Sequence, residues 1–139
     1  MTRFVLDASY AISWAREEEQ TPGALNHLRA LGQREAAALV PMLWCIEITN
    51  VLLTLERSNK LSAELISEWT TTFCTLPITV FSTDIEQSLT EIRPLAKAHG
   101  LSVYDASYLH LAMREQIPLA TLDRQLIKAA PQVGVRLLD

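Results

Sequence analysis

The sequence is poor in the residues that mark irregular or covalently linked chains. Its 139 residues include only 4 Gly, 6 Pro and 2 Cys. So little Gly and Pro excludes a collagen-like or low-complexity chain, because both classes are rich in these residues. Cys45 and Cys74 are isolated and form no C-x-x-C pair, so we expect two reduced core thiols and no cysteine metal site.

Long apolar runs are also missing. The uncharged stretch from Ala36 to Ile46 contains Pro41 and is too short to span a bilayer. The apolar segment Phe4–Leu6 is stopped by Asp7, well short of the roughly 7–15 apolar residues of a signal peptide. We therefore expect a cytoplasmic protein that does not bind a membrane.

Positive charge is in short supply as well. The chain has 12 Lys and Arg against 16 Asp and Glu, a formal net charge of −4. A protein that holds nucleic acid by bulk charge depends on many Lys and Arg contacts to phosphate. Any nucleic-acid binding by this chain must therefore depend on a local site or on a bridging cation.

Half of the chain is apolar, at 49 %, and its length matches one domain of about 100–200 residues. We expect residues 1–139 to form a single domain. Short apolar runs alternate with longer helical patterns, which is typical of a parallel sheet with helices on both faces. The expected strands are Arg3–Leu6, Ala38–Val40, Ile78–Phe81, Leu119–Thr121 and Val135–Leu138.

The helical patterns separate these strands. The expected helices are Ala8–Glu17, one that starts at Thr21-Pro22, Leu43–Ser58, Ser62–Leu76, one from a capping box at Thr83–Glu86 to His99-Gly100, Val103–Glu115 and Arg124–Ala130. Two of them follow each other between the second and third strands, with a short turn at residues 59–61. This order predicts a projecting helical hairpin.

Three carboxylates lie where helices are expected to begin: Asp7 and Asp123 each follow an expected strand, and Asp105 follows Ser102. Asp7 and Asp123 would face one crevice if their strands are neighbours, because ligands of open α/β sheets bind at the carboxyl ends of the strands. Each Asp is also a good helix cap, and Ser102-x-x-Asp105 matches a capping box. Taken singly, each residue is therefore explained as well by a cap as by catalysis.

Glu47 adds a fourth carboxylate. It belongs to an expected helix with apolar residues on two faces, and it shares the remaining narrow polar stripe with Asn50. That stripe is either a solvated face or a row directed into a shared cleft, where Asn50 would support Glu47 by hydrogen bonding. Four carboxylates in one cleft would repel each other unless a cation neutralised them. Hard oxygen ligands of this kind suit Mg²⁺ or Mn²⁺.

Four segments together resemble the ordered acidic motifs of PIN-domain ribonucleases, in particular the VapC-type toxins of toxin–antitoxin pairs. They are Leu6-Asp7-Ala8-Ser9, Trp44-x-x-Glu47-x-x-Asn50-Val51-Leu52, Ser102-Val103-Tyr104-Asp105-Ala106-x-Tyr108-Leu109 and Leu119-Ala120-Thr121-Leu122-Asp123-x-x-Leu126. The resemblance extends over the whole chain and implies a three-layer α/β/α sandwich with a short-stranded parallel sheet.

The resemblance also implies a site and a reaction. Asp7, Glu47, Asp105 and Asp123 would be the catalytic residues and would hold one or two Mg²⁺ or Mn²⁺ ions, and the supporting residues would be Ser9, Asn50 and Thr121. The expected activity is endoribonuclease cleavage by a metal-activated water, which leaves 5′-phosphate and 3′-hydroxyl ends.

Partners follow from the same resemblance. We expect an RNA substrate and an antitoxin protein whose segment docks over the hairpin of residues 43–76 and reaches toward the acids with an Arg or Lys. Candidate residues for that groove, or for a homodimer interface, are Ile46, Leu53, Ile66 and Trp69. The alternative is that all four belong to the core.

Two other classes of function compete with the ribonuclease. A phosphoaspartate protein would need D-x-D after its first strand, where this chain has Ser9, or a Lys at the end of a late strand, which it lacks. A non-catalytic RNA- or protein-binding module would keep the fold without needing all four acids. Metal-dependent RNA cleavage separates these alternatives.

Overall fold

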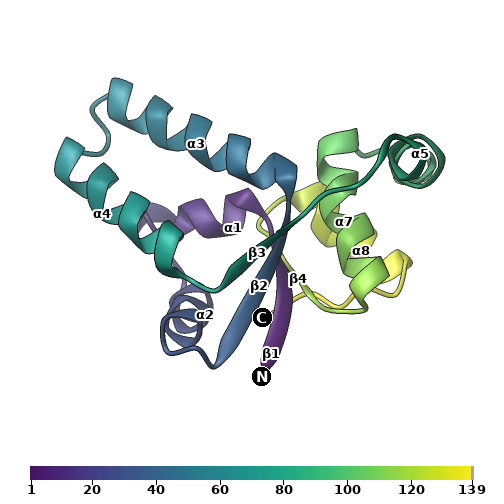
Figure 1. Ribbon diagram of the computed structural model, residues 1–139, viewed down its shortest axis with the longest axis horizontal. Helices are drawn as coiled ribbons and strands as arrows, with labels where there is room; N and C mark the ends of the chain where they lie inside the picture. Colours follow the sequence, from purple (N-terminus) through teal and green to yellow (C-terminus); the bar gives the residue numbers. More distant parts are fainter. Residues whose placement is uncertain (139) are drawn as a thin grey trace.

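The computed structural model describes residues 1–138 and has a parallel sheet of four strands between two layers of helices (Figure 1). The strands are β1 (Thr2–Leu6), β2 (Ala36–Pro41), β3 (Ile78–Phe81) and β4 (Leu119–Ala120), and they lie side by side in the order β3-β2-β1-β4. The predicted α/β sandwich is confirmed. No helix within residues 1–138 is long and apolar enough to cross a membrane.

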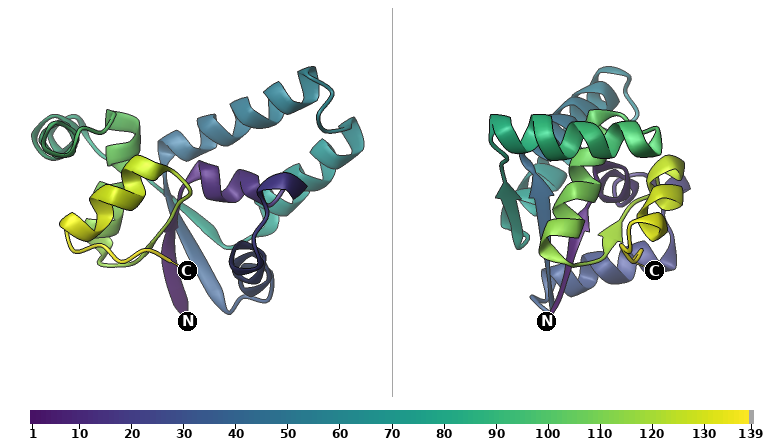
Figure 2. Two further views of the ribbon diagram at one scale, coloured as in Figure 1. Left: turned by 180° about the vertical axis from the view of Figure 1, so that it is seen from behind. Right: turned by 90° about the vertical axis from the view of Figure 1, so that its right-hand side faces the viewer.

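The helices divide between the two faces of the sheet (Figures 1 and 2). One layer contains α1 (Ala8–Ser13), η1 (Glu17–Glu19), α2 (Pro22–Gly32), α3 (Met42–Arg57) and α4 (Ala63–Thr75). The other contains α5 (Ile85–Gln87), η2 (Ser88–Ile92), α6 (Arg93–His99), α7 (Val103–Glu115) and α8 (Arg124–Gln132). As predicted, α3 and α4 form a hairpin that projects beyond the sheet (Figure 1).

The core lies where β1 meets the two helical layers. Phe4, Val5 and Leu6 of β1 are fully buried, which explains why this part of the strand is apolar, whereas Thr2 and Arg3 at its start are exposed. On one side α7 packs against β1 and β2 and contributes Tyr108, which is also fully buried. On the other side lies Trp14, the residue that directly follows α1. It is buried and donates its indole N–H to the carbonyl of Ala24, 2.9 Å away.

The predicted fifth strand is wrong. Only one bridge, between Leu119 and Leu137, joins the segment Val135–Leu138 to β4. Because β4 itself has only two residues, it offers this segment little backbone to pair with. The predicted Cys74 core thiol is also wrong, since this side chain is exposed on α4, whereas Cys45 is half-buried.

Two predicted helices differ in detail. The helix that begins at Ala8 ends at Ser13, and Arg16 is extended before the short turn η1. The helix expected from Thr83 is capped by Asp84, whose Oδ1 accepts the backbone N–H of Gln87 at 2.7 Å. It then passes through the π-helical turn η2 directly before α6, where Pro94 lies in the first turn. Pro has no N–H for a regular helical hydrogen bond, which favours such a local change of register.

The strand order defines where a site can form. The chain runs outward from β1 to β2 and β3, and later returns to the opposite side of β1 to form β4. The carboxyl ends of β1 and β4 therefore lie at a topological switch point, which is where open α/β sheets bind ligands. Asp7 follows β1 at this point, and Thr121 follows β4.

Candidate active site

Asp7 is a buried carboxylate held by two hydroxyl groups. Its Oδ2 accepts a hydrogen bond from Ser9 Oγ at 2.6 Å and another from Thr121 Oγ1 at 2.7 Å. Asp7 precedes α1 but makes no side-chain capping bond to it, so the cap explanation does not hold at this position. Burial raises the pKa of Asp7 most strongly, the two hydroxyl groups lower it, and the charge of Asp123 raises it further.

Glu47 approaches from α3 and is half-buried. Its Oε1 accepts a hydrogen bond from the hydroxyl of Tyr108 on α7. Burial raises the pKa of Glu47, the Tyr108 hydroxyl lowers it, and the charges of Asp7 and Asp105 raise it. Glu47 is thus directed toward the other acids, and the alternative of a solvated stripe is wrong for this residue.

Asp105 lies in the first turn of α7. The cap of this helix is Ser102, whose Oγ accepts the backbone N–H of Asp105 at 3.0 Å, so half of the predicted capping box is present. The pKa of Asp105 is raised mainly by burial and then by the charges of Asp123 and Asp7, while the Ser102 hydroxyl lowers it. Asp105 therefore belongs to the same cluster as Asp7 and Glu47.

Asp123 serves as a cap in addition to joining the cluster. Its Oδ1 accepts the backbone N–H of Leu126 at 3.0 Å and caps α8, while its own N–H donates to Thr121 Oγ1 at 3.0 Å. Its charge raises the pKa of both Asp7 and Asp105. Asp123 can therefore cap α8 and also belong to the candidate site, because the cap uses only one of its two carboxylate oxygens.

The four acids, Asp7, Glu47, Asp105 and Asp123, are called the acidic cluster below. Within residues 1–138, none of them has a Lys, Arg or His nitrogen within salt-bridge distance. Three of the four have raised pKa values, and the charge of another member of the cluster contributes to each. The arrangement concentrates negative charge that the described side chains do not neutralise.

The cluster fits a hard divalent cation by its donor chemistry. In the described part of the chain, no three His, Cys, Asp or Glu side chains are arranged to hold one metal ion directly. Mg²⁺ needs no such cage, since it keeps several waters and is usually bound through one or two carboxylates. Asp7 has the best-defined orientation of the cluster, because two hydroxyl groups hold the same carboxylate oxygen.

The predicted supporting residues differ in position. Ser9 and Thr121 contact Asp7, and Ser9 Oγ also accepts the backbone N–H of Leu122 at 3.1 Å, which joins the start of α1 to the loop after β4. Asn50 is exposed, and no hydrogen bond within residues 1–138 joins it to the cluster. Tyr108 was not singled out from the sequence as a supporting residue. It occurs three residues after Asp105, one helical turn away, and this spacing was the available signal.

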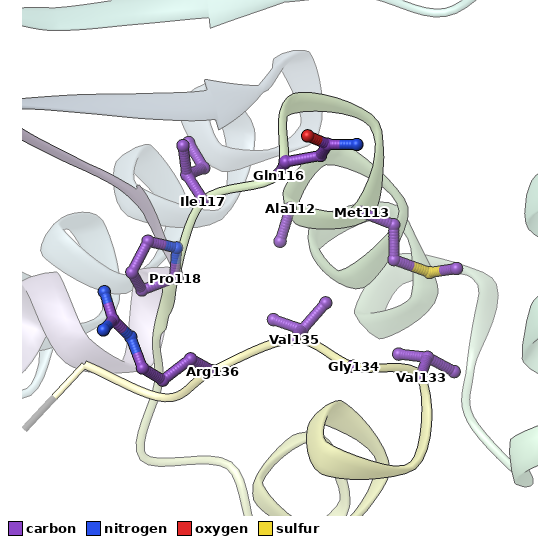
Figure 3. A pocket seen from close by; sticks show the side chains of 9 residues that line it. All are labelled: Ala112, Met113, Gln116, Ile117, Pro118, Val133, Gly134, Val135 and Arg136. Carbon is purple, nitrogen blue, oxygen red and sulfur yellow. The ribbon is translucent and has the colours of Figure 1, made fainter.

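A separate cavity of about 520 Å³ lies at the other end of the fold, between the end of α7 and the segment that follows α8 (Figure 3). Its walls are mainly apolar, with Val133 and Val135 opposite Ala112 and Met113, and the polar side chains of Gln116 and Arg136 on the same walls. No member of the acidic cluster lines this cavity. The carboxyl edge of the sheet therefore remains the candidate site.

Comparison with known proteins identifies the family of this fold. The family model of the PIN domain matches residues 4–131. No curated protein sequence matches the chain significantly.

Solved structures share the fold at low sequence identity. VapBC2 from Rickettsia felis, bound to a DNA fragment from their promoter, matches with a TM-score of 0.67 at 13 % identity, over 99 % of this chain and 98 % of that chain. FitAcB from Neisseria gonorrhoeae matches with a TM-score of 0.65 at 16 % identity, over 98 % and 96 %. A toxin–antitoxin complex from Klebsiella pneumoniae matches with a TM-score of 0.53 at 15 % identity, over 86 % of each chain.

Proposed function

The chain belongs to the PIN domain family, and from this membership we propose that it is a metal-dependent endoribonuclease, the VapC-type toxin of a toxin–antitoxin pair. The observation that carries the proposal is the acidic cluster, which has no basic partner within the described residues and lies at the carboxyl ends of β1 and β4. Carboxylates left unneutralised at a ligand-binding edge are expensive to maintain unless they bind a cation.

The chain's own residues orient the cluster. Ser9 and Thr121 hold Asp7 by one carboxylate oxygen and leave the other available. The Tyr108 hydroxyl holds Glu47 from the opposite side. The bonds to Asp7 link α1 to the loop after β4, and the bond to Glu47 links α3 to α7. A substrate phosphate at the cluster would therefore meet two carboxylates that are held in place by other parts of the fold.

We propose Mg²⁺ or Mn²⁺ as the cation, held by carboxylates of Asp7, Glu47, Asp105 and Asp123. When bound, it would supply an activated water and neutralise charge on the phosphodiester. Hydrolysis by water needs no attack by the 2′-hydroxyl of the RNA. The products would therefore carry 5′-phosphate and 3′-hydroxyl ends.

The test is incubation of the purified protein with single-stranded RNA, with Mg²⁺ or Mn²⁺ and with EDTA. The proposal predicts cleavage that requires the metal, with 5′-phosphate ends identified by mass spectrometry. Products with 2′,3′-cyclic phosphates would contradict the mechanism. Absence of cleavage with either metal would favour a binding module that keeps the fold without catalysis.

We also propose an antitoxin partner for the hairpin of α3 and α4. Its two helices border an apolar groove of about 440 Å³ lined by residues such as Trp44, Ile48 and Phe73. At the surface of the same hairpin, Ile46 is 69 % exposed and Leu53 is 39 % exposed. An amphipathic segment of the antitoxin would cover these side chains, and a basic residue on it would neutralise the acidic cluster.

The same exposed apolar residues support a homodimer as the alternative cover for the hairpin. Ile66 and Trp69 of α4 are only half-buried, so they are not completely enclosed within one chain. Light scattering on the isolated protein tests this part of the proposal. A strict monomer at high concentration would contradict the homodimer and leave the antitoxin as the proposed cover.

A further inference from the structure

The chain keeps its aromatic side chains away from solvent, with one exception. It has three Trp, three Tyr and three Phe. Among these, only Tyr104 is exposed, with 65 % of its surface accessible, whereas the other eight are buried or half-buried. Tyr104 is therefore the one aromatic side chain whose exposure is not explained by packing in the core.

Tyr104 lies beside the acidic cluster. It directly precedes Asp105 in the first turn of α7, and it lies one helical turn before Tyr108, which donates a hydrogen bond to Glu47. Residues four apart share one side of a helix, and side chains lean toward the N-terminus of their helix. Tyr104 is thus on the side of α7 that faces Glu47, at the rim of the cluster.

Two other acids of the cluster also directly follow an exposed apolar residue. Ile46, which directly precedes Glu47, is 69 % exposed, and Leu122, which directly precedes Asp123, is 37 % exposed. Three of the four acids therefore follow an exposed apolar residue in the sequence. None of these three preceding residues is a Lys or Arg that could bind a phosphate. The net charge of −4 also means that the chain as a whole gains little affinity for a polyanion from its overall charge.

An unpaired base meets these conditions better than a phosphate group does. Every base has an apolar face that stacks on an aromatic ring, whichever base it is, and such stacking provides affinity without positive charge. We propose that Tyr104 is a substrate-binding residue that stacks against an unpaired base next to the scissile phosphate, with Ile46 and Leu122 as the apolar rim. This proposal rests on the ribonuclease function proposed above and adds that the substrate is single-stranded at this position.

The test uses the full-length protein and a short single-stranded oligoribonucleotide that carries 2-aminopurine, whose fluorescence falls when it stacks. Tyr104→Leu removes the ring and keeps an apolar side chain, while Tyr104→Phe keeps the ring. The expected result for Tyr104→Leu is a KM increased by roughly tenfold to hundredfold, little change in kcat, and loss of the fluorescence quenching. Tyr104→Phe should restore both the KM and the quenching.

A matched control removes another exposed apolar side chain. Leu65 of α4 is 42 % exposed, and Leu65→Ala should leave the KM for RNA unchanged. Thermal melting of each variant shows whether it is folded.

Three results would overturn the proposal. If Tyr104→Leu cleaves RNA with the parent's KM and quenching, the stacking role is wrong and the ribonuclease function stands. A change of oligomeric state in Tyr104→Leu, with unchanged KM, would assign the ring to a protein interface. If the parent neither binds nor cleaves RNA with Mg²⁺ or Mn²⁺, the proposed function fails together with the stacking role.

Discussion

The hydroxyl of Tyr108 on α7 donates a hydrogen bond to Oε1 of Glu47 on α3, and this bond joins two helices from opposite layers across the acidic cluster. It has consequences for both side chains. The bond lowers the pKa of Glu47 against the effect of burial. Burial and the neighbouring carboxylate together raise the pKa of Tyr108, so its hydroxyl stays protonated and acts as a donor.

Tyr108→Phe tests what this bond does. Without the hydroxyl, the pKa of Glu47 should rise, so the acidic limb of the activity profile should move to higher pH. The free energy of unfolding should fall by about 1 kcal/mol for the lost hydrogen bond. A pH–rate profile identical to that of the parent would show that Glu47 ionisation does not depend on Tyr108.

Ser102→Ala should affect both stability and activity, because Ser102 caps α7 and lowers the pKa of Asp105. Loss of the cap should cost about 1 kcal/mol. The pKa of Asp105 should rise, and RNA cleavage should weaken most at acidic pH.

Ser62→Ala is the matched control for that variant. Ser62 Oγ caps α4 in the same way, by accepting the backbone N–H of Leu65 at 3.2 Å. Its loss should cost a similar free energy without any change in the pH dependence of cleavage. Equal effects of the two variants on cleavage would mean that Ser102 acts only through helix stability.

The metal-free protein should become less stable as the pH rises above about 4. Asp7, Glu47 and Asp105 have higher pKa values in the folded chain than their ordinary values, so the folded state binds more protons than the unfolded state in this range. Their contribution is most favourable below the ordinary values and is lost as the pH rises through the raised ones. The midpoint of thermal unfolding, measured in EDTA across this pH range, should fall with rising pH for the parent. It should fall less for Asp7→Asn.

Mg²⁺ should reverse this loss. A ligand that binds only the folded state stabilises it by about 2.7 kcal/mol at a concentration 100-fold above its Kd. The gain should be largest at pH values where the acidic cluster is ionised and should vanish at acidic pH. A melting temperature that does not respond to Mg²⁺ or Mn²⁺ at neutral pH would argue against metal binding at this site.

The fold could be predicted from the sequence because apolar strands alternate with helical patterns along the whole chain. Where the prediction of the fold fails, the cause is physical. Val135–Leu138 has the composition of a strand but finds only two residues of β4 to pair with. The π-helical turn η2 changes a hydrogen-bonding register, which leaves no mark in the apolar periodicity apart from the nearby Pro94.

The candidate site was predictable in part. Asp7 and Asp123 follow strands, but their proximity depends on β1 and β4 being neighbours, which the strand patterns alone do not determine. Tyr108 occupies a buried position in its motif, and the sequence pattern alone assigns it no role of its own. Its contact with Glu47 spans 61 positions in the sequence and becomes visible only once α3 and α7 are placed.

Cleavage of single-stranded RNA by Asp105→Asn tests the central claim most directly, with Asp84→Asn as its control. Asp84 is an exposed cap of α5, and Asn caps a helix about as well as Asp, so Asp84→Asn should cleave like the parent. The cap of α7 is Ser102 and not Asp105, so Asp105→Asn should also fold. Its metal-free form should melt at the same or a higher temperature, because repulsion among the carboxylates is relieved. The account predicts that Asp105→Asn loses most metal-dependent cleavage and binds Mn²⁺ more weakly. Parental cleavage and Mn²⁺ affinity in Asp105→Asn would contradict the acidic cluster as the site of a metal-dependent ribonuclease.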